Sequence, residues 1–209
     1  MKNNKSETNP EGYEIHLKKE KKKTKFHKYR VNNVLSNLNI KPSDNILDLG
    51  CGAGTFTTEI KKLTSHVTGL DYNEYAIKIC EKKGIKVIKS LSHSIPVEDN
   101  TYDMITAVDF FEHIPETVSI ATLKECNRIL KPGGRIAIYS PNNDIYEFFR
   151  FNPLHIGLKK IEEIKQLLMF SGFNIKFQKH FPIHVFPLNL IYKTRRILVI
   201  GEKIKIITK

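Results

Sequence analysis

The sequence lacks an uninterrupted run of about 20 apolar residues, which is the length that a membrane-spanning helix needs. Its most apolar stretch, residues 181–201, is broken by two prolines and three basic side chains. The first nine residues are polar and contain no apolar core of the kind found in secretory signals. We therefore expect a cytoplasmic protein with no transmembrane segment.

Cysteine is also scarce. The three cysteines, Cys51, Cys80 and Cys126, are far apart in the sequence and form no Cys-x-x-Cys pair. This pattern is typical of neither a disulfide framework nor a cysteine-based zinc site, so the sequence predicts no metal. A chain of 209 residues can bury a hydrophobic core without such links. We expect Cys80 and Cys126 to be small buried apolar residues.

Acidic residues are outnumbered, and the formal net charge is +12. The excess lies at the two ends of the chain. Residues 1–30 carry ten lysines and arginines against four glutamates, and residues 193–209 carry six against one. Such ends can dock on nucleic acid or on an anionic membrane surface through salt-sensitive attraction. Because lysine outnumbers arginine 28 to 6, a general compositional bias explains the same excess, and both interpretations remain open.

Four segments can be distinguished along the chain. The first is polar throughout and is expected to be disordered. The second is rich in lysine, and its apolar residues are spaced as on one face of a helix, at Val31, Val34, Leu35 and Leu38. The predicted segments are a disordered tail at 1–12, a basic helical extension at 13–40, a core domain at 41–181, and a basic, apolar C-terminal segment at 182–209 that completes the fold.

In the core domain, short β-branched runs alternate with amphipathic helical ones. Because parallel strands need crossover connections, this alternation predicts an α/β fold with a doubly wound, mostly parallel sheet and helices on both faces, as in Rossmann-like proteins. The predicted strands are 46–49, 66–70, 86–89, 102–108, 135–139 and 174–179, and the predicted helices cover 56–63, 75–83, the residues from Pro115 onward, and 158–170. A Lys-Pro-Gly-Gly turn at 131–134 precedes the fifth strand.

The pattern is ambiguous after residue 181. Residues 188–201 have an apolar stripe at helical spacing, but Arg195 falls within that stripe. The alternative is a pair of late strands at 197–200 and 204–208. The sequence leaves both open.

A glycine-rich turn, Asp-Leu-Gly-Cys-Gly-Ala-Gly at 48–54, follows the first strand. Glycine suits a turn whose backbone takes unusual dihedral angles and approaches a ligand closely. Asp71 ends the second strand, 23 residues after Asp48, where its carboxylate can accept hydrogen bonds from both hydroxyls of a ribose. A glycine turn and a downstream acid together predict a ligand that contains adenosine.

The loop chemistry favours a cationic ligand over a dinucleotide. The dinucleotide motif Gly-x-Gly-x-x-Gly needs glycine at the position of Thr55, whereas this chain has glycine one place earlier, at Gly54. The carboxylate of Asp48, which precedes the glycines, would repel a pyrophosphate but suits positively charged sulfonium and amino groups. The sequence therefore predicts S-adenosyl-L-methionine as the cofactor and methyl transfer as the reaction.

Residues 44–181 resemble a class I S-adenosylmethionine-dependent methyltransferase. Three motifs carry the resemblance: the loop motif at 46–54, Gly-Leu-Asp at 69–71, and Asn-Arg-Ile-Leu-Lys-Pro-Gly-Gly at 127–134. It implies that the loop holds the methionine part, Asp71 the ribose, and Tyr72 the adenine by stacking. The family often contacts adenine with an aspartate after the third strand, but this chain has Ser-Leu-Ser-His at 90–93, which leaves main-chain contacts. The implied cofactor-binding residues are Asp48, Gly50, Cys51, Gly52, Gly54, Asp71, Tyr72, Leu91, Ser92 and Asp109.

The stretch from Asp109 to Pro115 follows the fourth strand and resembles the Leu-Glu-His motif of small-molecule methyltransferases such as the ubiquinone-pathway O-methyltransferases. His113 is the first candidate for a general base, because an imidazole titrates near neutral pH. The alternative is that Glu112 and His113 bind the loop backbone and cap the next helix. Asp109 is a candidate for contact with the cofactor's amino group or for an acid–base role. His155 is the second catalytic candidate.

Three functions of the protein remain open. The first is O-methylation of a small molecule, for which aromatic residues at 146–151 offer an apolar site, although they suit a lid or an interface equally well. The second is methylation of RNA docked by the basic termini, although the Asn/Asp-Pro-Pro-Tyr motif of nucleic-acid amino methylation is absent. The third is a non-catalytic module that binds the cofactor or a partner. Peripheral membrane contact through residues 182–209 is a further expectation.

Overall fold

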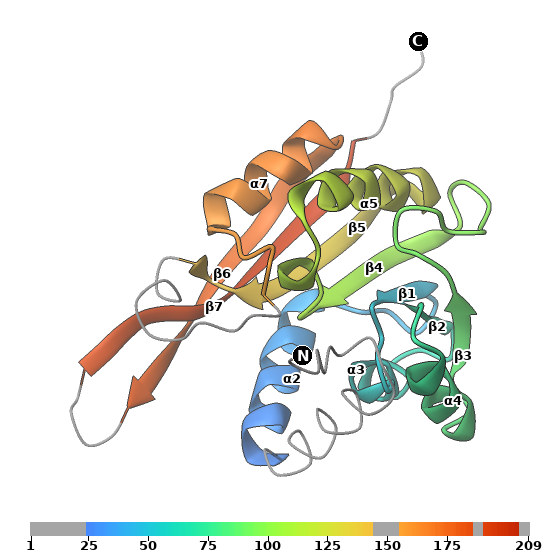
Figure 1. The fold of residues 1–209 in the computed structure, drawn as a ribbon, viewed down its shortest axis with the longest axis horizontal. Coiled ribbons are helices and arrows are strands. Elements are labelled where there is room, and N and C mark those ends of the chain that lie inside the picture. The colour runs from blue at the N-terminus through green and yellow to red at the C-terminus, as the bar shows by residue number, and fades with distance from the viewer. Residues whose placement is uncertain (1–23, 144–154, 186–189, 205–209) are drawn as a thin grey trace, which may run out of the picture.

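The computed structural model describes residues 24–143, 155–185 and 190–204 of the chain (Figure 1), and their side chains except at 24–29, 182–185 and 190–195. The expected tail at 1–12, the aromatic residues at 146–151 and most of the late strand expected at 204–208 lie outside the described residues. In the described part of the chain, no helix has both the length and the apolar character needed to cross a membrane.

The described residues form one seven-stranded sheet with the order β3-β2-β1-β4-β5-β7-β6. The strands from β3 to β5 pair in parallel, and β7 is antiparallel to both of its neighbours. The bounds are β1 Ile46–Leu49, β2 Val67–Asp71, β3 Lys86–Lys89, β4 Tyr102–Val108, β5 Leu130–Pro141, β6 Phe173–Val185 and β7 Leu190–Lys203. The strand order reverses at β1, between β2 and β4. A ligand is expected in the crevice beyond the carboxyl ends of these strands.

Helices cover both faces of the sheet (Figure 1). On one face α2 and α3 bury their apolar residues in a cluster with β1, β4 and β5, and α4 lies on the same side. On the other face α5 and α7 pack against the same strands in a second cluster. The bounds are α2 Thr24–Leu38, α3 Thr55–Ile60, α4 Glu74–Lys82, α5 Glu116–Ile129 and α7 Ile161–Phe170, with a single 3-10 turn, η1, at Phe111–His113. This arrangement confirms the predicted doubly wound α/β fold.

Two local predictions need correction. The Lys-Pro-Gly-Gly segment at 131–134 does not precede the fifth strand but forms an irregularity within β5, between the pairs Tyr102–Leu130 and Met104–Arg135. The predicted helix at 158–170 begins three residues later, at Ile161. In both cases pairing with a neighbouring element, which local propensity does not reveal, sets the boundary.

The strand alternative is correct at the C-terminus and the helix alternative is wrong for residues 190–201. Here the chain forms β7, which is inserted between β5 and β6 and pairs with both. Ile197, Leu198 and Val199 are fully buried there. Successive side chains of a strand face opposite sides of a sheet. Accordingly, Leu198 joins the cluster beneath α2, and its two neighbours join the cluster beneath α5 and α7.

Truncation of Leu198 tests the buried position of β7. Leu198→Ala should lower the free energy of unfolding by about 2–5 kcal/mol, because it leaves a cavity in a packed cluster. Leu63→Ala, at a leucine that is 42% exposed, should change it by less than about 0.5 kcal/mol. Urea denaturation of both variants provides the measurement. Equal small effects would show that β7 is not part of the core.

Candidate functional site

The glycine loop connects β1 to α3 at the carboxyl end of the sheet. Gly50, Gly52 and Gly54 have φ angles of 68°, 52° and 71°, in the left-handed region that favours glycine. A Cβ atom at Gly50 would lie 2.3 Å from Cδ2 of Phe110, and one at Gly54 would lie 2.5 Å from Cδ1 of Ile85. The loop therefore needs glycine both for its conformation and for its close packing.

Asp48 lies beneath this loop and is almost completely buried. Its two carboxylate oxygens accept hydrogen bonds from the hydroxyls of Thr57, at 2.6 Å, and Thr106, at 2.8 Å. Burial raises the pKa of Asp48 from 3.8 to about 6, and the two hydroxyl bonds oppose that shift. The observed contacts of this side chain join β1 to α3 and β4.

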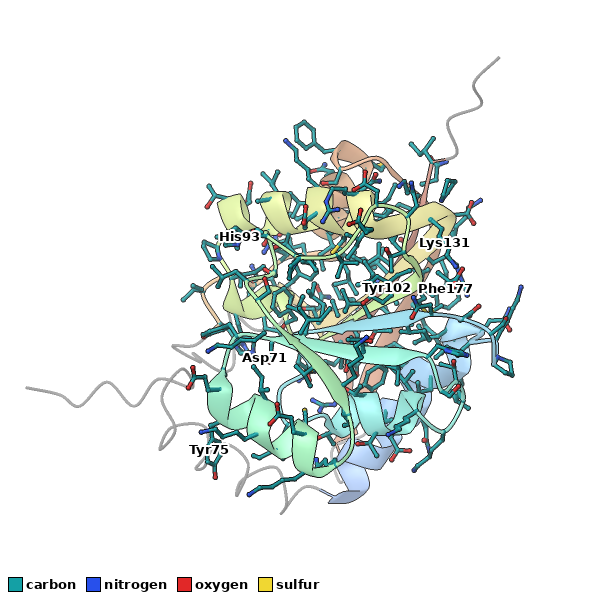
Figure 2. All side chains as sticks on the ribbon, turned by 90° about the vertical axis from the view of Figure 1, so that its right-hand side faces the viewer. Asp71, Tyr75, His93, Tyr102, Lys131 and Phe177 are labelled. Carbon is teal, nitrogen blue, oxygen red and sulfur yellow. The ribbon has the colours of Figure 1, made fainter. Side chains whose placement is uncertain are left out.

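Asp71 holds the middle of the loop from the end of β2. Its carboxylate accepts hydrogen bonds from the backbone N–H groups of Gly52, at 2.8 Å, and Asn73, at 2.9 Å. Burial raises the pKa of Asp71, and these backbone bonds lower it. Figure 2 shows Asp71 toward one end of the sheet, with Tyr102 and Lys131 toward the other. A carboxylate oxygen can accept more than one bond, so Asp71 can also bind ligand hydroxyls.

The backbone of Cys51 is part of the same connection. Its N–H donates to the carbonyl of Leu70 at 3.0 Å, while its sulfur lies over Gly69, where a Cβ atom would come within 2.6 Å. The Cys80 thiol donates to the carbonyl of Gly52 at 3.1 Å. Cys80 and Cys126 are both fully buried, as the sequence predicts.

The expected adenine side of the site lies next to Asp71. The N–H of Ser90 donates to the carbonyl of Asp71 at 3.1 Å, which places the segment after β3 beside the end of β2. Tyr72 is 51% exposed and Leu91 is 52% exposed. Ser92 is buried, and its hydroxyl pairs with that of Thr122 at 2.8 Å. The serine side chain is therefore engaged within the protein.

Asp109, a candidate for contact with the cofactor's amino group or for an acid–base role, has both carboxylate oxygens engaged within the protein. One of its oxygens forms an ion pair with Arg30 of α2, and the other forms an ion pair with Arg196 of β7. These partners are 79 and 87 residues away in the chain, so no local pattern predicts the two ion pairs. The guanidinium of Arg196 also lies 5.6 Å from the ring centre of Tyr139. Asp109 thus links both ends of the described chain to the end of β4.

The two candidate catalytic histidines are neighbours, although they are far apart in the sequence. The ring centres of His113 and His155 are 5.1 Å apart and the ring planes are inclined by 75°. His113 ends η1, and its N–H donates to the carbonyl of Phe110 at 3.0 Å. Glu112 is fully buried and accepts a hydrogen bond from the Ser140 hydroxyl at 3.2 Å. Its burial raises the pKa of the carboxyl group to about 7.

The residues around the glycine loop fit S-adenosylmethionine. Side chains at Gly50 and Gly54 would collide with Phe110 and Ile85, so the loop keeps the tight glycine turn that a nucleoside cofactor needs. The carboxylates of Asp48, beneath the loop, and of Asp71, which binds Gly52, suit a cationic ligand better than a pyrophosphate. An open cleft of about 700 Å³ lies elsewhere, at the amino ends of β2 and β4, lined by residues that include Thr68 and Tyr102, and it is remote from these groups.

Sequence reasoning missed three side chains of the site. Phe110, which packs over Gly50, lies in the Asp109–Pro115 stretch, and an aromatic directly after the end of a strand was the available signal. Arg30 and Arg196 carried no local signal, because only the tertiary fold brings them to Asp109.

The pH dependence of stability tests the buried position of Asp48. Because its pKa is higher in the folded than in the unfolded chain, the folded protein binds this proton more tightly. The stability that Asp48 provides should therefore fall by up to ~3 kcal/mol as the pH rises from about 4 to about 6. Asp48→Asn lacks this titration, so its free energy of unfolding should rise relative to the wild type across that window. Urea denaturation at several pH values measures the difference, and a difference independent of pH would contradict the assignment.

Comparisons with known proteins agree with this geometry. Residues 47–138 match a family model described as a methyltransferase domain. A sterol 24-C-methyltransferase, ERG6B, from Gibberella zeae is 36% identical over 121 residues, a match that covers 53% of this chain and 31% of that protein. A demethylmenaquinone methyltransferase from Staphylococcus saprophyticus is 26% identical over 204 residues, which covers 80% of this chain and 86% of that protein. The chain thus spans about a third of the sterol enzyme's length and most of the second protein's.

Solved structures share the fold. A methyltransferase from Thermotoga maritima, described as a possible histamine N-methyltransferase, superposes with a TM-score of 0.73 at 19% identity, covering 91% of this chain and 97% of that one. A Haloferax volcanii methyltransferase, solved in complex with the activator Trm112, gives 0.72 at 17% identity, with coverage of 89% and 94%. The glycine loop, the sheet order and the match over residues 47–138 thus give the chain a methyltransferase domain with the fold of S-adenosylmethionine-dependent methyltransferases.

Proposed function

We propose that the protein transfers a methyl group from S-adenosylmethionine to an oxygen atom of a small apolar acceptor. When bound, the cofactor supplies a methyl group that is already activated by its positively charged sulfur. Transfer then depends mainly on how the protein positions the two molecules and excludes water. The single observation that carries the proposal is the pair of imidazoles, His113 and His155, which Phe110 links to the glycine loop.

On the cofactor side, we propose that the backbone from Gly50 to Gly54 holds the methionine part and that Asp71 accepts both ribose hydroxyls. The bonds from Gly52 and Asn73 already fix the direction of the Asp71 carboxylate. Tyr72 and the main chain of residues 91 and 92 then lie beside the adenine. Asp48 contributes from below by holding the loop in place.

Asp109 has a different proposed role from its neighbours. Its ion pairs with Arg30 and Arg196 hold α2 and β7 at the edge of the crevice. We therefore propose that residues 13–40 and 182–209 complete a cofactor site whose central part is the core domain at 41–181. Two guanidinium groups more than neutralise the Asp109 carboxylate, so we propose that it positions these elements and does not bind the cofactor's positive amino group.

On the acceptor side, the two histidines are placed to act on a hydroxyl group. A neutral imidazole can accept the proton that an alcohol or phenol loses when it is methylated, and such groups titrate near neutral pH. Phe110 connects this pair to the cofactor, since it packs on Gly50 and its carbonyl accepts from the N–H of His113. The acceptor oxygen would therefore lie between the imidazoles and the loop.

Two observations support an apolar acceptor: the aromatic side chains next to the histidines and the names of similar proteins. The Phe110 and Phe111 rings, which directly precede Glu112 and His113 in the sequence, pack edge to face with centres 5.3 Å apart. Two similar proteins are named for apolar small-molecule acceptors, demethylmenaquinone and a sterol. The sterol relative is named for methylation of carbon, so the atom that is methylated needs a direct product analysis.

Replacement of Asp71 tests the cofactor site. Asp71→Ala should weaken the binding of S-adenosylmethionine at least about tenfold, because two ribose hydroxyls lose their acceptor. Asp99→Ala, at an exposed aspartate outside the crevice, should leave the affinity unchanged. Isothermal titration calorimetry measures both, and thermal unfolding checks that each variant is folded. Unchanged affinity in Asp71→Ala would rule out the assigned ribose site.

Turnover with a labelled methyl group tests the acceptor class. The protein is incubated with methyl-labelled S-adenosylmethionine and a cell extract, which is then separated into small molecules, lipids, RNA and protein. We expect the label in apolar small molecules, with a methyl resonance typical of an ether in the nuclear magnetic resonance spectrum. A methyl bound to carbon would contradict O-methylation, and label in RNA or protein would contradict the small-molecule acceptor. No transfer to any fraction would contradict the proposed enzyme activity.

A further inference from the structure

Three side chains with metal-binding atoms converge beyond the end of β4. Glu112 and His113 come from η1, and His155 comes from the segment that leads to α7. One ligand atom from each of the three lies within 4.8 Å of the others. Among the described residues, this is the one group of three or more histidine, cysteine or acidic side chains with such spacing.

Specific backbone contacts hold the two parts of this cluster together. The N–H of Gly157 donates to the carbonyl of Glu112 at 2.9 Å. The buried ammonium of Lys159 donates to the carbonyl of Gly157 at 2.7 Å and to that of Phe111 at 3.4 Å. A Cβ atom at Gly157 would lie 1.9 Å from the carbonyl oxygen of Ile114, so only glycine permits this approach. These contacts hold the segment before α7 against η1 and so place the two histidines next to each other.

The set of donor atoms is typical of a metal site with open positions. Two imidazoles and one carboxylate can occupy one face of a divalent transition-metal ion and leave the remaining positions for water or substrate. Bond lengths near 2.0–2.2 Å place ligand atoms roughly 3–4 Å apart around a shared ion. The observed upper limit of 4.8 Å requires only small side-chain rotations to reach that range.

The carboxyl group of Glu112 is fully buried, with the positively charged side chains of Arg30 and Lys159 near it. The hydroxyl of Ser140 donates to one carboxylate oxygen at 3.2 Å and fixes its direction. Such a hydrogen bond to a ligand carboxylate is common in metal sites, where it orients the ligand. The nearby lysine and arginine will reduce the affinity for a cation without abolishing it.

We propose that Glu112, His113 and His155 bind one divalent transition-metal ion, which takes an oxygen atom of the methyl acceptor as a further ligand. The acceptor is then an alcohol, phenol or enol. The role in methyl transfer rests on the proposed function, whereas binding of the ion does not. A bound ion lowers the pKa of a hydroxyl group that it contacts, so the hydroxyl proton passes to bulk water before methyl transfer and neither histidine needs to accept it. The two imidazoles of the proposed function would thus act through the ion.

Titration with cobalt and zinc tests this site in the absence of cofactor and acceptor. The full-length protein is first treated with a chelator and then titrated with Co²⁺, whose visible absorption reports imidazole ligation, and bound Co²⁺ is displaced with Zn²⁺. We expect one equivalent of Co²⁺ per chain. Glu112→Gln and His155→Ala should each weaken binding at least about tenfold. Absence of stoichiometric binding by the wild type would overturn the proposal.

A matched control separates this site from adventitious binding by histidines. His66 is exposed and lies just before the amino end of β2, at the opposite end of the sheet from the cluster. His66→Ala should bind Co²⁺ like the wild type, and equal losses in His66→Ala and His155→Ala would overturn the proposal. Glu112→Gln preserves the shape of the side chain, and thermal unfolding identifies a variant that has lost its fold.

Calorimetry with S-adenosylmethionine distinguishes the metal site from the proposed function. If the wild type binds S-adenosylmethionine and methylates an acceptor but binds no Co²⁺, the metal site is wrong and the proposed function stands. If it binds Co²⁺ through the three residues but transfers no methyl group, the metal site stands and the proposed function is wrong.

Discussion

The carboxylate of Asp48 lies beneath the glycine loop and holds together the three elements that meet there. Its hydrogen bonds to Thr57 and Thr106 connect β1, where it lies, to α3 and β4. The group is almost completely buried, and burial of an acid is unfavourable unless both oxygens are engaged. The loop runs from β1 to α3, with left-handed residues at Gly50 and Gly54. Because Asp48 joins these two elements, the path of the loop depends on its contacts. The contact with Thr106 also sets the position of the loop relative to β4, and so relative to the histidines.

Around this centre, the site is completed by segments that are distant in the sequence. Asp109 brings α2 and β7 to the end of β4 through its two arginine partners. Gly157 and Lys159 bring the segment before α7 against η1, and so place His155 beside His113. The parallel half of the sheet thus supplies the proposed cofactor site, whereas the residues beside the acceptor come from the connections after β4 and β5. In such an arrangement the residues beside the acceptor can change without disturbing the cofactor site, because connections tolerate change better than a packed sheet does.

The sequence predicted the parts of the structure that local patterns determine. The strands from β1 to β4, the amphipathic helices and the glycine turn are predicted near their observed positions, since each is encoded within a few residues, whereas β5 and β6 are longer than predicted. The strand β7 was ambiguous, because pairing with β5 and β6 decides its conformation while its apolar spacing also fits a helix. Local sequence patterns also do not reveal the long-range contacts of the candidate site. His113 and His155 were both named as candidates, but their contact, like the ion pairs of Asp109, arises only from the tertiary fold. Residues 1–23 and 205–209 lie outside the described residues, and the hypotheses about the tail and about docking by the basic ends stay predictions.

A crystal structure of the protein with S-adenosylhomocysteine, the product form of the cofactor, tests the central claim most directly. The account predicts that the ribose hydroxyls bind Asp71, that the amino acid part lies along the backbone from Gly50 to Gly54, and that the sulfur points toward His113 and His155. A ligand bound elsewhere, or bound in the crevice with its sulfur directed away from the two histidines, would contradict it.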